Sequence, residues 1–207
     1  MNVRQAYGQW AATYDSDRNL TRDLDQVVTR DTLGRFHCHS ILELGSGTGK
    51  NTAFLSQLAR QVYGIDFSEA MLSRAREKLD LDNVAFTVGD LTRPWPFRSQ
   101  SAELISCNLV LEHIQDLGFI FSEAARSLSP HGRLFISELH PFRQYHGARA
   151  NFQRADERTE IPAFVHHISD FLDTAAANGL ALKELREWWH AEDRDKPPRL
   201  VSFLFEK

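Results

Sequence analysis

The chain has 207 residues, of which 42% are hydrophobic and 25% are charged, a composition typical of a soluble globular protein with one sizeable core. The formal net charge is −4 and Lys and Arg form no long run, which argues against nucleic acid as the main partner. Cys38 and Cys107 lack metal-ligand spacing, so we expect no disulfide framework and a reducing, cytoplasmic location. We expect neither a signal peptide nor a membrane partner, because no apolar leader and no run of about 18 apolar residues occurs.

The N-terminal third of the chain begins with two predicted helices and continues into alternating elements. The second helix, over 21–33, is amphipathic, with an apolar stripe made by Leu24, Val27, Val28 and Leu33. Short apolar runs rich in β-branched residues follow, and we predict strands over 40–44, 61–66, 84–89, 103–108 and 132–139. Helical spacing separates them, over 51–60, 68–79 and 117–128. This alternation predicts βαβ units, and therefore a parallel sheet covered on both faces.

Several local signals mark where these elements begin and end. Ser68 and Asp116 are placed to cap the helices that follow them, and residues 129–132 (SPHG) predict a turn. The segment 140–162 is charged, aromatic and without periodicity, and long connections of this kind are usually functional. The rest of the chain predicts one helix and two strands, over 167–179, 180–189 and 199–207.

A glycine-rich stretch, ILELGSGTGKN (41–51), leads from the first predicted strand into a helix. Such a loop gathers backbone N–H groups and the positive end of a helix dipole around a ligand. A triphosphate loop is excluded, because Leu44 occupies its first glycine position and Asn51 its hydroxyl position. A dinucleotide loop is weakened, because Lys50 occupies the position of its third glycine. On this stretch alone, a nicotinamide-dependent oxidoreductase remains an alternative.

Four stretches in this order resemble class I S-adenosylmethionine-dependent methyltransferases: LELGSGTGKNT (42–52), VYGIDFSEAMLSRAREK (62–78), VGDLTRPWPF (88–97) and ISCNLVLEHI (105–114). The resemblance covers the chain well from Val3 to Glu138 and the rest in outline. It implies an α/β fold, a doubly wound Rossmann-like sandwich whose seven-stranded sheet has the order 3-2-1-4-5-7-6. Strand 7 is then antiparallel, which places residues 199–207 inside the sheet.

The same resemblance implies a single methyltransferase domain over 1–207. Within it we expect an N-terminal helical lid (1–35), a cofactor-binding core (36–139), an acceptor-side insertion (140–166) and a last helix with antiparallel strands (167–207).

The resemblance also implies S-adenosylmethionine as the cofactor, bound over the carboxyl ends of the strands. Asp66, 21 positions after Gly45, is then the acceptor for both ribose hydroxyls. Asp90 is expected to bind the adenine amino group, with the Leu91 N–H on the ring. The other expected cofactor contacts are backbone approach at Gly45, Ser46, Gly47 and Gly89, adenine packing by Phe67 and Met71, methionine contacts by Glu43 and Asn108, and lid closure by Tyr14.

Methyl transfer from a sulfonium is an in-line displacement that relies on orientation and needs a base only if the nucleophile arrives protonated. The candidate catalytic residues are His113 after the fourth strand, His140 after the fifth, and Tyr14 in the lid. For His113 the alternative remains open that it has a structural role and takes no part in catalysis. We expect no metal site, because neither His37–His39 nor His166–His167 has further ligands at suitable spacing.

We therefore expect methyl transfer to an O- or N-nucleophile of a small molecule. The alternative is carboxyl O-methylation of an acyl group on a carrier protein, because AYGQWAATYDSD (6–17) resembles the start of malonyl-carrier-protein methyltransferases. Arg143, Arg149 and Arg154 would then supply a basic docking surface. A nicotinamide-dependent oxidoreductase or a non-catalytic cofactor-binding protein is less expected. Both a monomer and a homodimer remain open.

Overall fold

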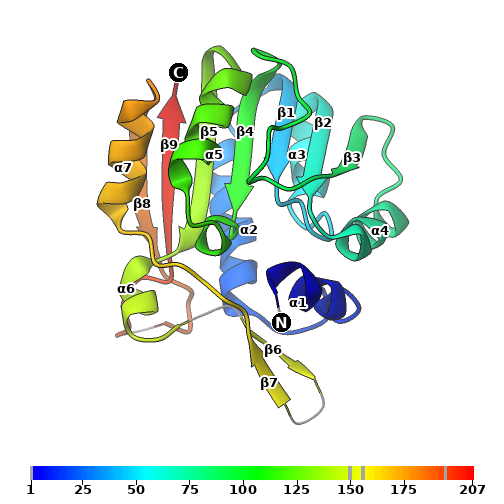
Figure 1. Ribbon diagram of the computed structural model, residues 1–207, viewed down its shortest axis with the longest axis vertical. Helices are drawn as coiled ribbons and strands as arrows, with labels where there is room; N and C mark the ends of the chain where they lie inside the picture. Colours follow the sequence, from blue (N-terminus) through cyan, green and yellow to red (C-terminus); the bar gives the residue numbers. More distant parts are fainter. Residues whose placement is uncertain (1, 149–150, 155–156, 194) are drawn as a thin grey trace.

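The computed structural model describes residues 2–148, 151–154, 157–193 and 195–207, with 151–154 and 157–160 as backbone. Seven strands form one sheet in the order β3-β2-β1-β4-β5-β9-β8 (Figure 1). β9 is antiparallel to both β5 and β8, which confirms the predicted order and the place of the last strand. The strands are β1 Cys38–Leu44, β2 Ala59–Asp66, β3 Val84–Val88, β4 Ala102–Asn108, β5 Leu128–Leu139, β8 Ala181–Trp188 and β9 Leu200–Glu206.

Helices cover both faces of this sheet. α2 and α3 pack on one face, α5 and α7 pack on the other, and α4 lies against β2 and β3. Ser68 and Asp116 cap α4 and α5 as predicted, since their side chains accept hydrogen bonds from the N–H groups of Met71 and Phe119. The helices are α1 Val3–Trp10, α2 Leu20–Leu33, α3 Thr52–Leu58, α4 Glu69–Lys78, α5 Leu117–Ser127, α6 Pro141–Tyr145 and α7 Ile168–Ala177, with a 3-10 turn η1 at Leu111–His113.

The central strands carry apolar side chains on both of their faces, because helices cover both faces of the sheet. In β1, Ile41 packs toward α2 and α3, whereas its neighbour Leu42 packs toward α5 and α7. β4 repeats this alternation with Leu104 and Ile105. Successive strand residues point to opposite faces, so a continuous apolar run places side chains in both cores.

Three expectations need correction. Val27 is 51% exposed, because the buried face of α2 also takes in polar residues such as Asp25 and Thr29. Residues 129–132 lie within β5, where the pairing with β4 shifts register. The segment 140–162 contains regular structure, namely α6 and a hairpin of β6 (Asn151–Arg154) and β7 (Glu157–Glu160).

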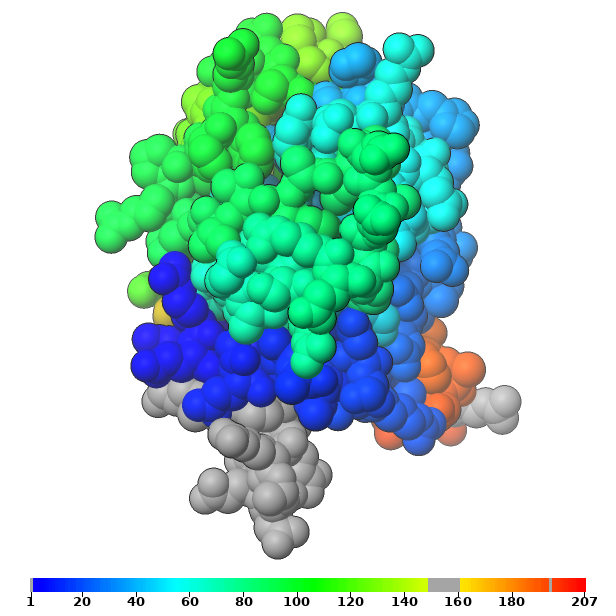
Figure 2. All heavy atoms as spheres, turned by 90° about the vertical axis from the view of Figure 1, so that its right-hand side faces the viewer, coloured from blue at the N-terminus to red at the C-terminus, as the bar shows by residue number. Residues whose placement is uncertain are grey.

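The carboxyl ends of the parallel strands converge on one edge of the sheet, and α1 lies across that edge (Figure 1). α1 contacts α4. In Figure 2 the N-terminal segment lies directly below the blue-green residues of α4 and forms the outer wall of this region. In the part of the chain that the structure describes, no helix is long and apolar enough to cross a membrane.

Candidate functional site

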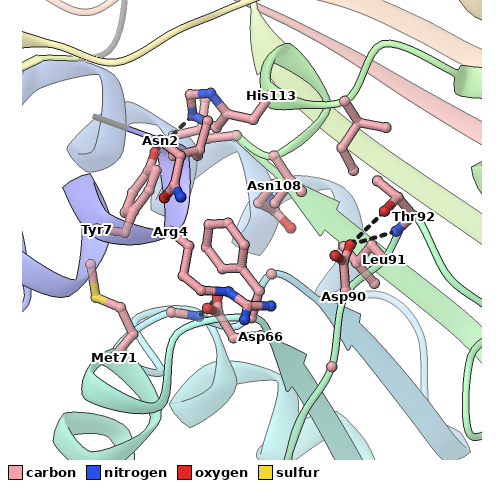
Figure 3. A pocket seen from close by; sticks show the side chains of 18 of the residues that line it. Asn2, Arg4, Tyr7, Asp66, Met71, Asp90, Leu91, Thr92, Asn108 and His113 are labelled. Atoms are coloured by element: carbon pink, nitrogen blue, oxygen red, sulfur yellow. Dashed lines mark hydrogen bonds between the residues drawn. The ribbon is translucent and has the colours of Figure 1, made fainter.

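A cavity of about 520 Å3 lies at the carboxyl edge of the sheet, under α1 (Figure 3). This volume falls in the range of about 300–1,000 Å3 typical of small-ligand sites. We call the loops after β1, β2 and β3 (residues 45–47, 66–68 and 89–92) the floor, and we call α1, η1 and residues 161–164 the roof. The predicted residues that line the cavity are Tyr14, Gly45, Gly47, Asp66, Phe67, Met71, Gly89, Asp90, Leu91, Asn108 and His113.

The glycine loop is shaped by positive backbone angles. Gly45 has φ +67° and Gly47 has φ +53°, a region that side chains other than glycine rarely adopt. A Cβ on Gly45 would lie 2.2 Å from Cγ2 of Val110. The structure thus gives a reason for glycine at position 45 that lies within the protein, whereas the sequence suggested collision with the ligand. At Gly47 a Cβ would be in ordinary contact with the Gly45 carbonyl oxygen, at 4.0 Å, and so would fit beside the cavity.

Asp66 is the central acid of the floor. Its Oδ2 accepts a hydrogen bond from the N–H of Gly47 at 2.9 Å, and its Oδ1 accepts one from the N–H of Ser68 at 2.8 Å. Burial raises the pKa of Asp66 to about 6, in spite of these hydrogen bonds. Each oxygen keeps a second lone pair, so the carboxylate can still accept two hydroxyl donors from the cavity.

Asp90 lies at the end of β3, and its Oδ1 accepts hydrogen bonds from the N–H and the hydroxyl of Thr92, at 3.0 and 2.7 Å. Burial opposes ionisation, but these hydrogen bonds outweigh it and lower the pKa of Asp90. Leu91 beside it is buried, and its carbonyl accepts from the Trp95 indole. The floor therefore offers an ionised acceptor next to an apolar surface.

A smaller cavity of about 50 Å3 adjoins the first, and Glu43, Ser46 and Asn108 line it. The Asn108 amide is turned toward α2, where its nitrogen donates to Asp25 and Thr29 at 2.9 Å each. Burial raises the pKa of Glu43 to about 8, and its carboxyl accepts a hydrogen bond from Thr52.

Sequence reasoning missed Asp25, which also accepts from Asn51 at 2.9 Å. The available signal was the spacing of Asp25 and Thr29, two polar residues one turn apart within the stripe of α2 that faces the sheet. Two buried polar atoms beside this small cavity, Oγ of Ser46 and Nε of Arg22, have no hydrogen-bond partner among the described residues. A zwitterionic amino-acid group would satisfy such atoms, so the residues present fit a cofactor that has one.

The roof brings together residues that are far apart in the sequence. The Tyr7 hydroxyl lies 2.9 Å from Nε2 of His113 (Figure 3). Nδ1 of His113 lies 2.9 Å from the carbonyl oxygen of Pro162. Ile161 packs against Trp10 of α1. Tyr14, which follows α1, lies under the Arg22 guanidinium at 4.0 Å, and burial raises its pKa to about 12. Segments that are far apart in the sequence, such as those of Tyr7 and His113 at 106 positions, therefore close the cavity together.

The structure does not bring His140 to the cavity. His140 begins α6 as its N-cap, so its Nδ1 accepts from the N–H of Phe142, while its Nε2 pairs with Glu187 at 2.8 Å. The Arg143 side chain also points inward: it pairs with Asp193 at 3.0 Å and donates to the carbonyl oxygens of Pro197 and Pro198. Arg149 and the side chain of Arg154 lie outside the described residues.

Arg4 is a further residue that the sequence did not indicate. It lines the cavity, and in Figure 3 its side chain runs toward Asp66. Its positive charge lowers the pKa values of both Asp66 and Asp90, although burial is the larger influence on each. Arg4 is the one Lys or Arg among the described residues that line the cavity.

Comparisons with known proteins match this architecture. Residues 42–136 match a family described as a methyltransferase domain. A malonyl-[acyl-carrier protein] O-methyltransferase of Halorhodospira halophila is 28% identical, over 81% of this chain and 58% of that protein. A demethylmenaquinone methyltransferase of Tropheryma whipplei (strain Twist) is 29% identical, over 92% of this chain and 79% of that protein.

A solved structure supports the fold independently. A crystal structure of an S-adenosylmethionine-dependent methyltransferase from Mesorhizobium loti superposes with a TM-score of 0.74 at 21% identity, covering 87% of this chain and 96% of that one. The chain spans between a third and three fifths of the length of several curated relatives that it matches. The matched domain, the strand order and the glycine loop agree: residues 42–136 match a methyltransferase domain, and the chain has the fold of an S-adenosylmethionine-dependent methyltransferase.

Proposed function

We propose that the chain transfers the methyl group of S-adenosylmethionine to a small-molecule acceptor by in-line displacement in the cavity of about 520 Å3. When bound, the cofactor supplies an electrophilic methyl group and leaves as a neutral thioether. The observation that carries this proposal is the meeting, in one cavity, of a floor with carboxylates at Asp66 and Asp90 and a roof with polar groups at Tyr7 and His113.

The floor would hold the cofactor. Asp66 accepts the ribose hydroxyls, Asp90 and the Leu91 N–H bind the adenine edge, and Phe67 and Met71 pack on its ring. The amino-acid end of the cofactor would enter the smaller cavity beside Glu43, Ser46 and Asn108. Buried polar atoms there have no hydrogen-bond partner among the described residues. Gly45, Gly47 and Gly89 have no side chains, so the cofactor can approach their backbone atoms.

The roof would hold the acceptor. Residues 1–35 act as a lid, with Tyr14 closing over the cofactor and His113 facing the acceptor. Such a lid removes water and fixes the orientation of the two reactants, and orientation of this kind is worth up to about 7–11 kcal/mol of the barrier. Residues 140–166 contribute to the acceptor side through the segment that contacts η1, where the N–H of Phe164 donates to the Glu112 carbonyl at 2.6 Å.

A second candidate is carboxyl O-methylation of an acyl group on a carrier protein. The relative from Halorhodospira halophila supports it by its name. The inward orientation of Arg143 removes one of the three cations expected on a docking surface for an acidic carrier. The relative from Tropheryma whipplei is named for a small-molecule acceptor, and we therefore keep the small-molecule acceptor as the first choice.

The experiment is a transfer assay with S-adenosylmethionine labelled in its methyl group. One arm contains a panel of phenols, alcohols and amines, a second arm contains malonyl-loaded acyl carrier protein, and mass spectrometry follows the label. Label on a small molecule, absent with Asp66→Ala, is the expected result. Label on the carrier protein alone would replace the proposal by the second candidate, and transfer in neither arm together with no cofactor binding would overturn both.

A further inference from the structure

The hydrogen bonds around His113 fix which of its nitrogens carries the proton. The Pro162 carbonyl oxygen can only accept, so Nδ1, 2.9 Å away, carries the hydrogen and donates it. Burial lowers the pKa of His113, which keeps the ring neutral at pH 7. Nε2 is then bare, and the Tyr7 hydroxyl donates to it at 2.9 Å. The oxygen of Tyr7 keeps its lone pairs for a partner in the cavity that both residues line.

This arrangement has the polarity of a base and not of an acid. A proton taken up by the Tyr7 oxygen releases the proton that Tyr7 already shares with His113. Nε2 of His113 receives this proton. The Nδ1–H of the same ring donates to a carbonyl oxygen, and such a hydrogen bond stabilises the imidazolium. Burial, followed by the charges of Tyr14, Glu112, Asp66 and Glu138, raises the pKa of Tyr7, so Tyr7 passes a proton on without becoming an anion.

We propose that Tyr7 and His113 form a proton relay that deprotonates a neutral hydroxyl, a phenol or an enol, on the methyl acceptor. This rests on the proposed methyl transfer. The O–H bond of the acceptor breaks, its proton moves to the Tyr7 oxygen, and the proton of Tyr7 moves to Nε2 of His113. The acceptor oxygen forms the bond to the methyl carbon, and the electron pair of the broken carbon–sulfur bond stays on sulfur. One positive charge leaves the sulfonium and one appears on the imidazole, so the charges balance.

The lack of charged groups among the described residues that line this end of the cavity favours a neutral hydroxyl over a charged methyl acceptor. The roof groups that line the cavity there are Tyr7 and His113, both neutral, and the apolar Val110 and Ile114. The Glu112 carboxyl lies 3.9 Å from Nε2 of His113, but it is buried and does not line the cavity, and burial raises its pKa to about 7. An amine arrives as an ammonium ion and would need a carboxylate, whereas a carboxylate acceptor would need a cation. Arg4, the cation that lines the cavity, runs toward Asp66 on the floor (Figure 3). A neutral hydroxyl needs neither partner, but it does need a base.

The test uses 4-nitrophenol as the probe, bound to protein that is saturated with S-adenosylhomocysteine. The visible absorption of the phenolate reports ionisation without any turnover. Because the relay takes up the proton, the bound probe should ionise with a midpoint about one pH unit or more below that of the free probe. In Tyr7→Phe and His113→Gln the phenolate would be buried without a counter-charge, so its midpoint should rise above that of the free probe.

Tyr145→Phe is the matched control, because Tyr145 also pairs with a histidine, at 2.5 Å from Nδ1 of His167, but does not line the cavity. It should leave the midpoint unchanged. An unshifted midpoint in the wild-type protein, absence of saturable probe binding, or the same midpoint in Tyr7→Phe would each overturn the relay.

Two measurements keep the relay separate from folding and from the proposed function. Nitrogen NMR of His113 in the free protein should show the Nδ1–H form, and the opposite form would contradict the relay even if no variant folds. Binding of S-adenosylhomocysteine, measured by calorimetry, should be retained within about threefold in Tyr7→Phe. Failure of the wild-type protein to bind it would instead refute the proposed methyl transfer.

Discussion

The floor and the roof of the cavity are built in different ways. Each part of the floor is a short loop at the end of one strand, and its main contact, from the Gly47 N–H to Asp66, joins neighbouring parallel strands. The roof depends on three separate segments, which meet through the contacts of His113 with Tyr7 and Pro162. The sheet therefore determines the floor, whereas the roof forms only once distant segments have packed. We expect the floor to fix the cofactor and the roof to fix the acceptor.

The largest effect should follow from Gly45→Ala on the floor. A left-handed residue costs about 1–2 kcal/mol when it is not glycine, and overlap with Val110 adds about 1–3 kcal/mol. Chemical denaturation should show that the free energy of unfolding falls by the sum of these two costs. Binding of S-adenosylhomocysteine should also be lost. Adding Val110→Ala should restore the overlap part and leave the backbone part. Full recovery in the double variant would mean that the positive φ at position 45 carries no cost.

The next effect concerns pH and the support of the roof. Glu138 accepts from the N–H groups of Val110 and Leu111 at 2.8 and 2.7 Å, and burial raises its pKa to about 8. An unfolded Glu ionises near its ordinary pKa of about 4.3, so between that pH and about 8 the unfolded state binds fewer protons. The free energy of unfolding should therefore fall as pH rises through this window, by a few kcal/mol.

Denaturation curves at pH 5 and pH 8 measure this fall. Glu138→Gln keeps an acceptor for η1 but cannot ionise, so it should flatten the pH dependence. Three further carboxyl groups account for the part that remains, because burial raises the pKa of Glu43 to about 8, that of Glu112 to about 7 and that of Asp66 to about 6. An unchanged slope in Glu138→Gln would show that Glu138 is ionised in the folded protein.

Asp66→Asn tests the floor alone. Loss of charge-assisted hydrogen bonds to the ribose should weaken S-adenosylhomocysteine binding by about 1.5–3 kcal/mol, roughly 10-fold to 150-fold. Because burial raises the pKa of Asp66 to about 6, wild-type affinity should also decline as pH falls through that value. The variant should lose this dependence, and a variant that binds like the wild type would place the ribose elsewhere.

The smallest effect should come from Tyr7→Phe in the roof. It removes one hydrogen bond to His113 and should lower the free energy of unfolding by about 0.5–1.5 kcal/mol. Denaturation curves measure the change, and Tyr145→Phe provides a comparison at a surface pair. A loss several times larger would show that the roof and the floor unfold as one unit.

Prediction from the sequence follows the same division. The strand order followed from the resemblance to methyltransferases. The meeting of Gly45, Asp66 and Asp90 was predictable from the strands themselves, because parallel strands bring their carboxyl ends to one edge. His140 was expected at the cavity because it also follows a strand, but the chain turns there into α6, and the imidazole caps that helix. Pro141 at the first position of α6 is a local signal of the helix start, but it does not show where the His140 imidazole points.

The partners of His113 could not be predicted either. Tyr7 lies 106 positions away and Pro162 lies 49 positions away, and each reaches the site through packing of the segments that carry it. Asp25 was missed because a polar residue within an apolar stripe gives no indication of which partners bury it. Contacts set by strand ends can be predicted from a sequence, whereas contacts between distant segments need the structure.

The most direct test is calorimetric titration of the wild-type protein with S-adenosylhomocysteine, with NADH as the parallel ligand. We predict micromolar binding of the first at one site per chain and no binding of the second. Binding of NADH without S-adenosylhomocysteine, or binding of neither, would contradict the assignment of the cavity to the methyl donor and every residue role derived from it.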